Sequence, residues 1–215
     1  MLVLTVAVLV VGLAARSTIV TGSGDFWINL VSIGILAVLA RQASMTTDEL
    51  GLQRRSLGAG LRWGGGAFAI ITAILIIAAA MPATSGFFDD DRVAISAAEL
   101  LLKVLVVIPI GTVVLEELAF RGVILALLRR LTSTMTAVVV AAVLFGLWHV
   151  PTAWNTSSAS SNAARLGAVA GTFVATAIAG LVFCFLRLRS RSLVAPVMAH
   201  IATNCVTFAL AWSLA

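Results

Sequence analysis

The chain has 215 residues, of which 61% are hydrophobic and 11% are charged, and its mean hydropathy is +1.12. A soluble domain of about this length buries only roughly 70% of its surface, so a soluble globule cannot hide this much apolar area. The net charge of +5 is spread over short hydrophilic gaps between apolar runs, which excludes a contiguous patch for nucleic acid. The composition predicts an all-α, polytopic transmembrane helical bundle.

Seven apolar segments along the chain predict about seven membrane helices. They cover residues 2–15, 26–40, 64–82, 99–128, 134–150, 164–186 and 192–213. The first segment has no positive region before it, so we expect a short membrane helix there and not a secretory signal. Pro151 is expected to end the fifth helix. No linker divides the chain, so residues 1–215 are expected to form one integral membrane domain, with 1–98 as an upstream helical shell and 99–208 as its core.

An interfacial helix is expected near residues 46–62, between the second and third apolar segments. Thr46 and Glu49 have the spacing of a helix-capping box. Leucines and arginines are interleaved over the following residues, which predicts one apolar and one basic face. Trp63 then marks the boundary with water.

The gaps between apolar segments alternate in charge. Basic residues gather at 41–62, 129–130 and 187–191, whereas Asp89, Asp90 and Asp91 crowd one intervening gap and a serine-rich stretch fills another. Arginine-rich gaps remain on the cytoplasmic side of a membrane. This pattern predicts a cytoplasmic N-terminus, with the acidic loop on the opposite face.

Glu116, Glu117 and Arg121 lie in the middle of an apolar stretch, residues 105–128. Each such group near a membrane midplane costs about 2.5 to 3.5 kcal/mol unless it is paired. Residues four apart share a helix face, so Glu117 is expected to pair with Arg121 and to support the structure. Glu116 is rotated by about 100° from Glu117. The spacing therefore separates a paired carboxylate from a free one.

The two histidines of the chain, His149 and His200, both lie in or at the edge of apolar segments. Phe145 shares a helix face with His149, and Asn204 shares one with His200. Counting from the arginine-rich gaps at about 1.5 Å per residue brings both imidazoles, Asn204 and Glu116 to a common depth. A carboxylate, two imidazoles and an amide on three helices predict a functional site inside the membrane.

Activation of a water molecule is the chemistry that suits these groups. Glu116 can act as a general base in low dielectric, and His149 can share or relay the proton. His200 and Asn204 could donate hydrogen bonds to the oxyanion formed during amide hydrolysis. The sequence contains no Gly-x-Ser-x-Gly elbow, no Cys–His nucleophile motif and no phosphate loop.

A zinc site is the alternative use of the same atoms, with Glu116, His149 and His200 as candidate ligands. The sequence has no His-Glu-x-x-His pair, and His200 cannot be a ligand and an oxyanion donor at once. We therefore favour a mechanism without a cofactor, with zinc as the alternative.

Three motifs follow one another in the chain: Glu116-Glu117-x-x-x-Arg121, Phe145-x-x-x-His149 and His200-x-x-x-Asn204. Over about residues 99–208 the chain resembles the CAAX prenyl protease and bacteriocin-processing (CPBP or Abi) family of intramembrane proteases. The resemblance implies that Glu116 and His149 activate the water and that His200 and Asn204 stabilise the oxyanion. The remaining motif residues, Glu117, Arg121 and Phe145, are expected to support the site.

The resemblance does not transfer a particular substrate, so only a class of substrate and a location are expected. The substrate would be a membrane-associated protein or lipidated peptide, met among membrane lipid in a prokaryotic cytoplasmic membrane. A proton- or solute-coupled transporter is an alternative, because ionisable groups within spans also build relays, although inverted repeats are not visible. A non-catalytic membrane adaptor or immunity protein with the same fold is a third possibility.

Overall fold

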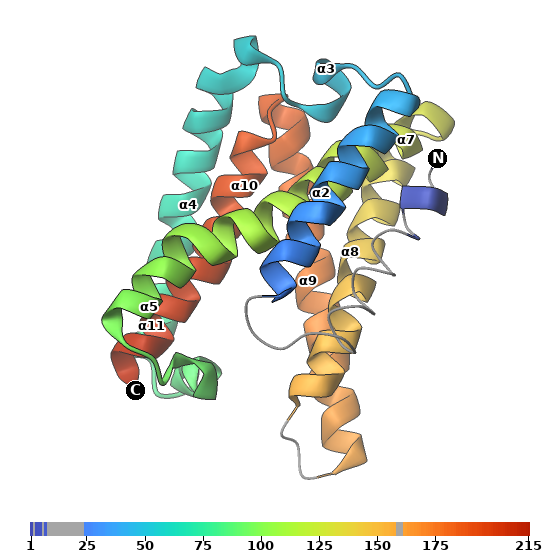
Figure 1. Cartoon of the computed structure of the whole chain (residues 1–215). Coiled ribbons are helices and arrows are strands. Elements are labelled where there is room, and N and C mark those ends of the chain that lie inside the picture. Colours follow the sequence, from blue (N-terminus) through green and yellow to red (C-terminus); the bar gives the residue numbers. More distant parts are fainter. Residues whose placement is uncertain (2, 6, 8–23, 158–160) are drawn as a thin grey trace.

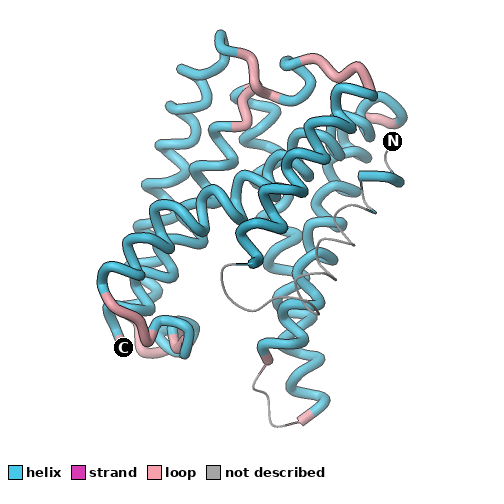
Figure 2. Tube along the Cα trace, in the orientation of Figure 1, coloured by secondary structure: helices cyan, strands magenta, loops and turns pink. Residues whose placement is uncertain are grey.

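The computed structural model describes residues 1, 3–5, 7, 24–157 and 161–215. Most of these residues are helical, and no strand occurs among them (Figure 2). The predicted all-α bundle is therefore confirmed. The predicted first membrane helix, residues 2–15, lies largely outside the described residues.

Five helical segments in the described part of the chain are long and apolar enough to cross a membrane. They are Thr47–Ala80, which contains α4 (Leu57–Ala80), the continuous helix Ala97–Leu131, α8 (Thr134–Thr156), α9 (Asn162–Ser190) and the segment Val194–Leu214. A shorter apolar helix, α2 (Gly24–Gln42), precedes them. Each predicted segment from residue 26 onward thus corresponds to a helix, and the chain is an integral membrane protein.

Two of these segments contain π-helical turns. The Ala97–Leu131 helix consists of α5 (Ala97–Leu102), π-helical η4 (Lys103–Val107) and η5 (Pro109–Val113), α6 (Val114–Glu117), π-helical η6 (Leu118–Ile124) and α7 (Leu125–Leu131). The last segment consists of α10 (Val194–Ile201), π-helical η7 (Ala202–Val206) and α11 (Thr207–Leu214). Such wide turns occur frequently at functional sites.

The Ala97–Leu131 helix, which we call the oblique helix, runs diagonally through the bundle (Figure 1). Figure 1 shows α2 lying across it, α8 and α9 forming an antiparallel hairpin on one side, and α4 beside α10 on the other. The buried centre between these helices includes Leu115, Phe120, Phe145 and Phe183. The central helices are thereby held against one another.

Close contact between α8 and α9 depends on a glycine. A Cβ atom on Gly180 would lie only 3.0 Å from Ala142 Cα and 3.1 Å from Ala142 Cβ. Small residues at such points let helix backbones approach closely in a membrane, where association depends on packing. This contact fixes α8, which carries Phe145 and His149, against α9.

The prediction of one interfacial helix over residues 46–62 is wrong, because the region is divided into separate elements. The capping box of Thr46 and Glu49 is present, but the helix it starts, α3, covers only Thr47–Leu50. Gly51 ends α3 in the left-handed region at φ 74°, a conformation that glycine adopts without the steric cost of a Cβ. A 3₁₀ turn, η1 (Arg54–Ser56), follows, and residues from Leu57 onward belong to α4.

The expectation that Pro151 ends its helix is also wrong. Helix α8 continues through Pro151 to Thr156. Proline removes one backbone hydrogen bond, and membrane helices tolerate it because neighbouring groups satisfy the backbone. His149 therefore lies within a helix, almost two turns before its end.

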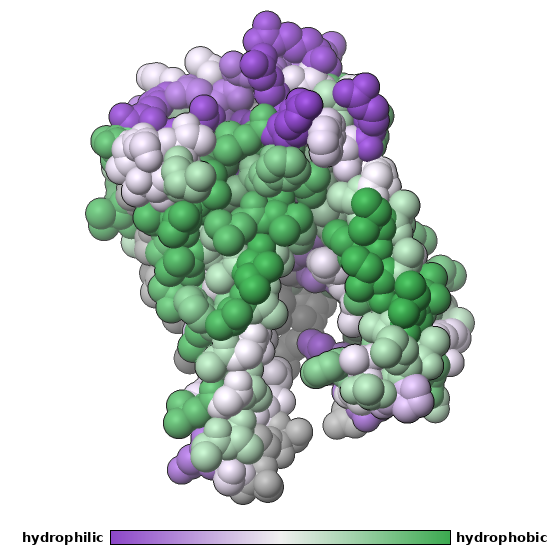
Figure 3. All heavy atoms as spheres, turned by 180° about the vertical axis from the view of Figure 1, so that it is seen from behind, coloured by the Kyte–Doolittle hydropathy of each residue, from purple (hydrophilic) through white to green (hydrophobic). Residues whose placement is uncertain are grey.

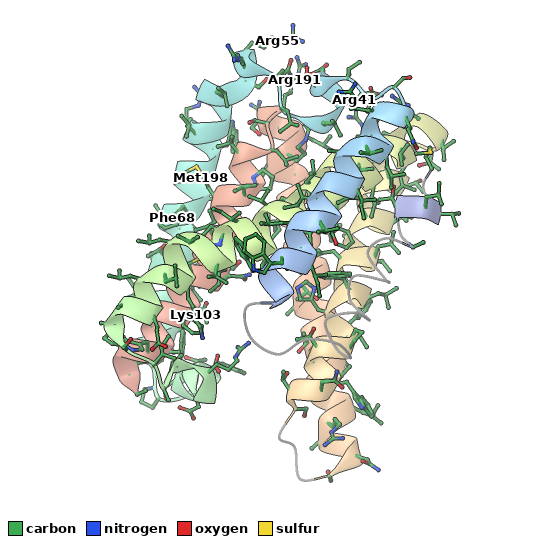
Figure 4. All side chains as sticks on the ribbon, viewed as in Figure 1. Arg41, Arg55, Phe68, Lys103, Arg191 and Met198 are labelled. Carbon is green, nitrogen blue, oxygen red and sulfur yellow. The ribbon has the colours of Figure 1, made fainter. Side chains whose placement is uncertain are left out.

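Hydrophilic side chains gather at one end of the bundle. Arg41, Arg55 and Arg191 lie at one end, whereas Lys103 lies toward the other (Figure 4). The opposite face of the molecule shows hydrophilic side chains gathered at this arginine-rich end, above a broad apolar belt (Figure 3). The loop at 81–96, with the 3₁₀ turns η2 (Ser85–Phe88) and η3 (Asp91–Val93), connects α4 to the oblique helix at the other end.

Candidate active site

The two glutamates lie side by side in the four-residue turn α6, between π-helical η5 and η6. Both side chains are buried, with Glu116 only 4% exposed and Glu117 not exposed at all. Their carboxylates nevertheless accept hydrogen bonds from different groups, as their rotation around the helix predicts.

Glu117 belongs to a buried charge network. Its Oε1 accepts a hydrogen bond of 2.8 Å from Arg121 Nη1, so the predicted ion pair is confirmed. The same oxygen lies 2.8 Å from His200 Nδ1, which donates to it in the tautomer that a carboxylate favours. This second contact connects the oblique helix to α10.

The Arg121 guanidinium is surrounded by aromatic rings. Its Cζ lies 4.0 Å from the centre of the Phe145 ring and 4.9 Å from that of Phe183. Rings attract a desolvated cation through their negative faces. Phe183 also stacks on His200, with ring centres 5.2 Å apart. The Phe145 ring thus covers the guanidinium, while its supporting role stays a prediction.

Glu116 lies outside the ion pair of Glu117 with Arg121 and faces both histidines. Its Oε1 accepts a hydrogen bond of 2.9 Å from the indole N–H of Trp148. Its Oε2 lies 3.8 Å from His149 Nε2 and 3.8 Å from His200 Nε2. Oε2 is buried and has no hydrogen-bond partner among the described residues. One carboxylate oxygen is therefore held while the other faces two imidazoles.

The two imidazole rings have defined orientations. His149 Nδ1 lies 2.8 Å from the Phe145 carbonyl oxygen, which can only accept, so Nδ1 carries the proton. In the neutral ring, His149 Nε2 then presents its lone pair toward Glu116. His149 is also the more accessible histidine, with 25% of its side chain exposed against 3% for His200.

Asn204 is held by His200 through the four-residue spacing that the sequence predicts. Its Nδ2 lies 3.2 Å from His200 Nε2, and its Oδ1 lies 3.4 Å from the Thr203 hydroxyl, which also bonds to the His200 carbonyl. Because His200 Nδ1 donates to Glu117, its neutral Nε2 accepts from the Asn204 amide. One of the two amide N–H groups of Asn204 is used in this way, and the other is left to act as a donor.

A cavity of about 500 Å³ exposes part of this cluster. Glu116, Trp148, His149 and Asn204 line it, whereas His200 lies behind Asn204. The other lining residues are Asp90, Arg92, Ile108, Thr112, Thr152, Thr203, Thr207 and Phe208. Since Asp90 and Arg92 belong to the loop at 81–96, the cavity extends to the end of the bundle opposite the arginine-rich end. Figure 3 shows the bundle hollowed there, with hydrophilic atoms between its two limbs.

An ion pair lies at this loop end of the cavity. Arg92 Nη2 and Nε donate to the Asp90 carboxylate at 2.6 Å and 2.8 Å. These hydrogen bonds, opposed by partial burial, hold the pKa of Asp90 below its ordinary value of 3.8 and raise the pKa of Arg92. The pair is therefore charged across the physiological range.

The described residues do not fit a zinc site as they stand. No group of three or more His, Cys, Asp or Glu side chains among them is arranged to hold a metal ion. Both nitrogens of His200 are engaged, by Glu117 and by Asn204. Binding of zinc by His200 Nε2 would require Asn204 to leave.

The structure brings together all seven residues that the sequence singles out, from three separated parts of the chain. Sequence reasoning missed Trp148, which precedes His149 and fixes Glu116 Oε1. The available signal was a tryptophan within a span, whose N–H needs a partner when it is buried. The contribution of Asp90 and Arg92 to the cavity was also missed, because it depends on the path of a loop.

The protein is thus an integral membrane protein in which a buried carboxylate lies near two imidazoles between the membrane helices. The chain belongs to the Rce1-like family, described as type II CAAX prenyl endopeptidase Rce1-like, whose family model matches residues 96–206, more than half of the chain. The matched range contains all three motifs, so the family resemblance is confirmed. No curated protein and no solved structure matched the chain.

Proposed function

We propose that the chain is an intramembrane endopeptidase that hydrolyses a peptide bond of a membrane-associated protein or lipidated peptide. Membership of a family of CAAX prenyl endopeptidases supports the reaction class. The observation that carries the mechanism is Glu116 Oε2, which is buried and lies 3.8 Å from Nε2 of both histidines. A water molecule that contacts Glu116 Oε2 and His149 Nε2 could donate one proton toward each of them.

The proposed reaction begins with attack of this water on the peptide carbonyl carbon. Glu116 takes a proton from the water as the new C–O bond forms, and the carbonyl oxygen becomes an oxyanion. The C–N bond then breaks, and Glu116 returns the proton to the leaving amine nitrogen. The products are an amine and a carboxylic acid, which ionises.

Asn204 is the proposed oxyanion donor. It lines the cavity, and one of its amide N–H groups is free when the other bonds to His200. In its neutral form His200 accepts at Nε2, so its role is to position Asn204; as an imidazolium, stabilised by Glu117, it would also donate. Arg121 and Glu117 orient His200 from behind.

The location of the cavity supports a direction of substrate entry. Arginine-rich ends face the cytoplasm, and the cavity extends to the other end. We therefore place the N-terminus and the arginine-rich end in the cytoplasm of a prokaryotic cell, with the cavity open toward the opposite face of its cytoplasmic membrane.

Cleavage of a lipidated peptide by the purified protein in proteoliposomes tests the proposal. We expect Glu116→Gln and His149→Ala to lose cleavage while remaining folded. Treatment with a chelator should leave the rate unchanged in the metal-free mechanism. Loss of cleavage that added zinc restores would favour the zinc alternative.

A further inference from the structure

A second cavity, of about 680 Å³, lies at the arginine-rich end, far along the bundle from the glutamates. We call it the basic cavity. It lies between α3, α7 and the ends of α8 and α9, and its lining residues are Asp48, Glu49, Ala126, Arg129, Arg130, Thr134, Arg187, Leu188 and Arg191. None of them lines the candidate active site.

The charges in the basic cavity do not balance. Arg130 donates to both oxygens of Glu49, at 2.7 Å and 2.8 Å, so this pair is neutral. Three arginines remain, at positions 129, 187 and 191, against the single carboxylate of Asp48. Asp48 also pairs with Arg55, with Oδ2 of Asp48 4.0 Å from Nη2 of Arg55. Arg55 does not line the basic cavity. The basic cavity thus carries an excess of positive charge.

Arg187 is the unusual member of the set, because it is only 4% exposed. Its Nη2 donates to the backbone carbonyls of Asp48 and Glu49, at 3.1 Å and 2.8 Å, and its Nε has no partner among the described residues. No carboxylate pairs with it in the described part of the chain. A buried guanidinium without an anion is costly, and a bound anion would reduce that cost.

Two general effects explain why some of these arginines occur at this end of the bundle. Basic residues favour the C-terminal turns of helices, and arginines gather on one side of a membrane. These effects explain the exposed Arg129 and Arg191, at the ends of α7 and α9. They do not explain why a third arginine is buried beside them in a recess.

We propose that the basic cavity binds the phosphate group of an anionic phospholipid. Guanidinium groups are suited to phosphate oxygens. Basic pockets between membrane helices on the cytoplasmic side bind such headgroups. Ala126 and Leu188 add apolar surface to the lining, and the arginine-rich end adjoins the apolar belt (Figure 3). This position suits a lipid better than a soluble phosphate compound.

Native mass spectrometry of the full chain in detergent tests the proposal, with phosphatidylglycerol and phosphatidylcholine added in turn. The test variant is the double substitution Arg129→Gln with Arg191→Gln, which leaves the buried Arg187 in place. The matched control is Arg54→Gln with Arg62→Gln, which removes two exposed arginines that do not line the basic cavity. A third arm adds inorganic phosphate in the millimolar range.

We expect the test variant to bind phosphatidylglycerol about 10- to 30-fold more weakly, because it has lost two basic groups. The affinity of the control variant for the same lipid should change less than about twofold. Phosphatidylcholine should be retained less than phosphatidylglycerol by the native protein. Equal losses in the two variants, or equal retention of the two lipids, would overturn the proposal. Release of bound phosphatidylglycerol by inorganic phosphate would overturn the assignment to a lipid.

Discussion

Glu117 Oε1 and His200 Nδ1 lie 2.8 Å apart, although 83 positions separate the two residues in the chain. The same oxygen accepts from Arg121 Nη1, and His200 in turn bonds to Asn204. A charge buried in the bundle is thereby connected to an amide in the cavity. The paired carboxylate, which helical spacing alone describes as structural, also orients the site.

Glu117→Gln should reduce both stability and cleavage. The amide keeps the size of the side chain but removes the negative charge, so Arg121 becomes an unpaired buried cation. Breaking a buried pair in this way costs about 3 to 5 kcal/mol. Thermal unfolding in detergent measures the loss of stability, and Glu116→Gln is the matched control because Glu116 has no arginine partner. Equal unfolding temperatures for Glu117→Gln and the unsubstituted protein would contradict this account of the network.

Hydrophobic segment length predicted most of the fold. Every described membrane helix corresponds to an apolar segment, because a span requires about 20 apolar residues whatever its neighbours. The errors occurred where local signals conflicted. Pro151 was expected to end α8, but packing within a membrane tolerates the missing hydrogen bond. The left-handed Gly51 divided a region that the capping box and leucine pattern presented as one helix.

The candidate site was predictable only in part. Four-residue spacing predicted the pairs of Glu117 with Arg121 and of His200 with Asn204, because such pairs share one helix face. The bonds from Trp148 to Glu116 and from His200 to Glu117 join separate helices. They depend on how helices pack, and a single sequence contains no direct signal for that.

Asn204→Ala should lower kcat by about 100- to 1,000-fold with little change in KM, the usual effect of removing one oxyanion donor. Steady-state cleavage of a lipidated peptide measures both constants. Thr152→Val is the control, since Thr152 also lines the cavity but is not one of the motif residues. A similar loss in both variants would indicate a general disturbance of the cavity and not the loss of a donor.

Asp90→Asn should lower stability slightly at neutral pH, by at most about 1 kcal/mol for a pair so exposed to solvent. Because the pKa of Asp90 is lowered in the folded protein, its pair with Arg92 stabilises above pH 3.8 and is lost as the pH falls through the lowered value. Unfolding temperatures of the two proteins should therefore differ at pH 7, begin to converge near pH 3.8 and meet once the pH is below the lowered pKa of Asp90. If the two unfolding temperatures still differ at the lowest pH, titration of Asp90 is not the source of the difference.

The orientation of the cavity predicts which face of the membrane reaches it. A cysteine at Thr152 should react with an impermeant maleimide added outside intact spheroplasts, whereas one at Arg54 should react only after the membrane is opened. The native Cys184 and Cys205 are buried, so background labelling should be low. The reverse pattern would place the arginine-rich end outside the cell.

Cleavage of a lipidated peptide by Glu116→Gln is the most direct test of the central claim that Glu116 is the general base. The amide can still accept from Trp148 through its oxygen, so folding should be preserved. We expect the rate to fall by at least about 100-fold, within the range for general-base catalysis, with an unchanged unfolding temperature. Asp89→Asn, an exposed carboxylate change, should retain the native rate. Cleavage by folded Glu116→Gln at the native rate would contradict the account.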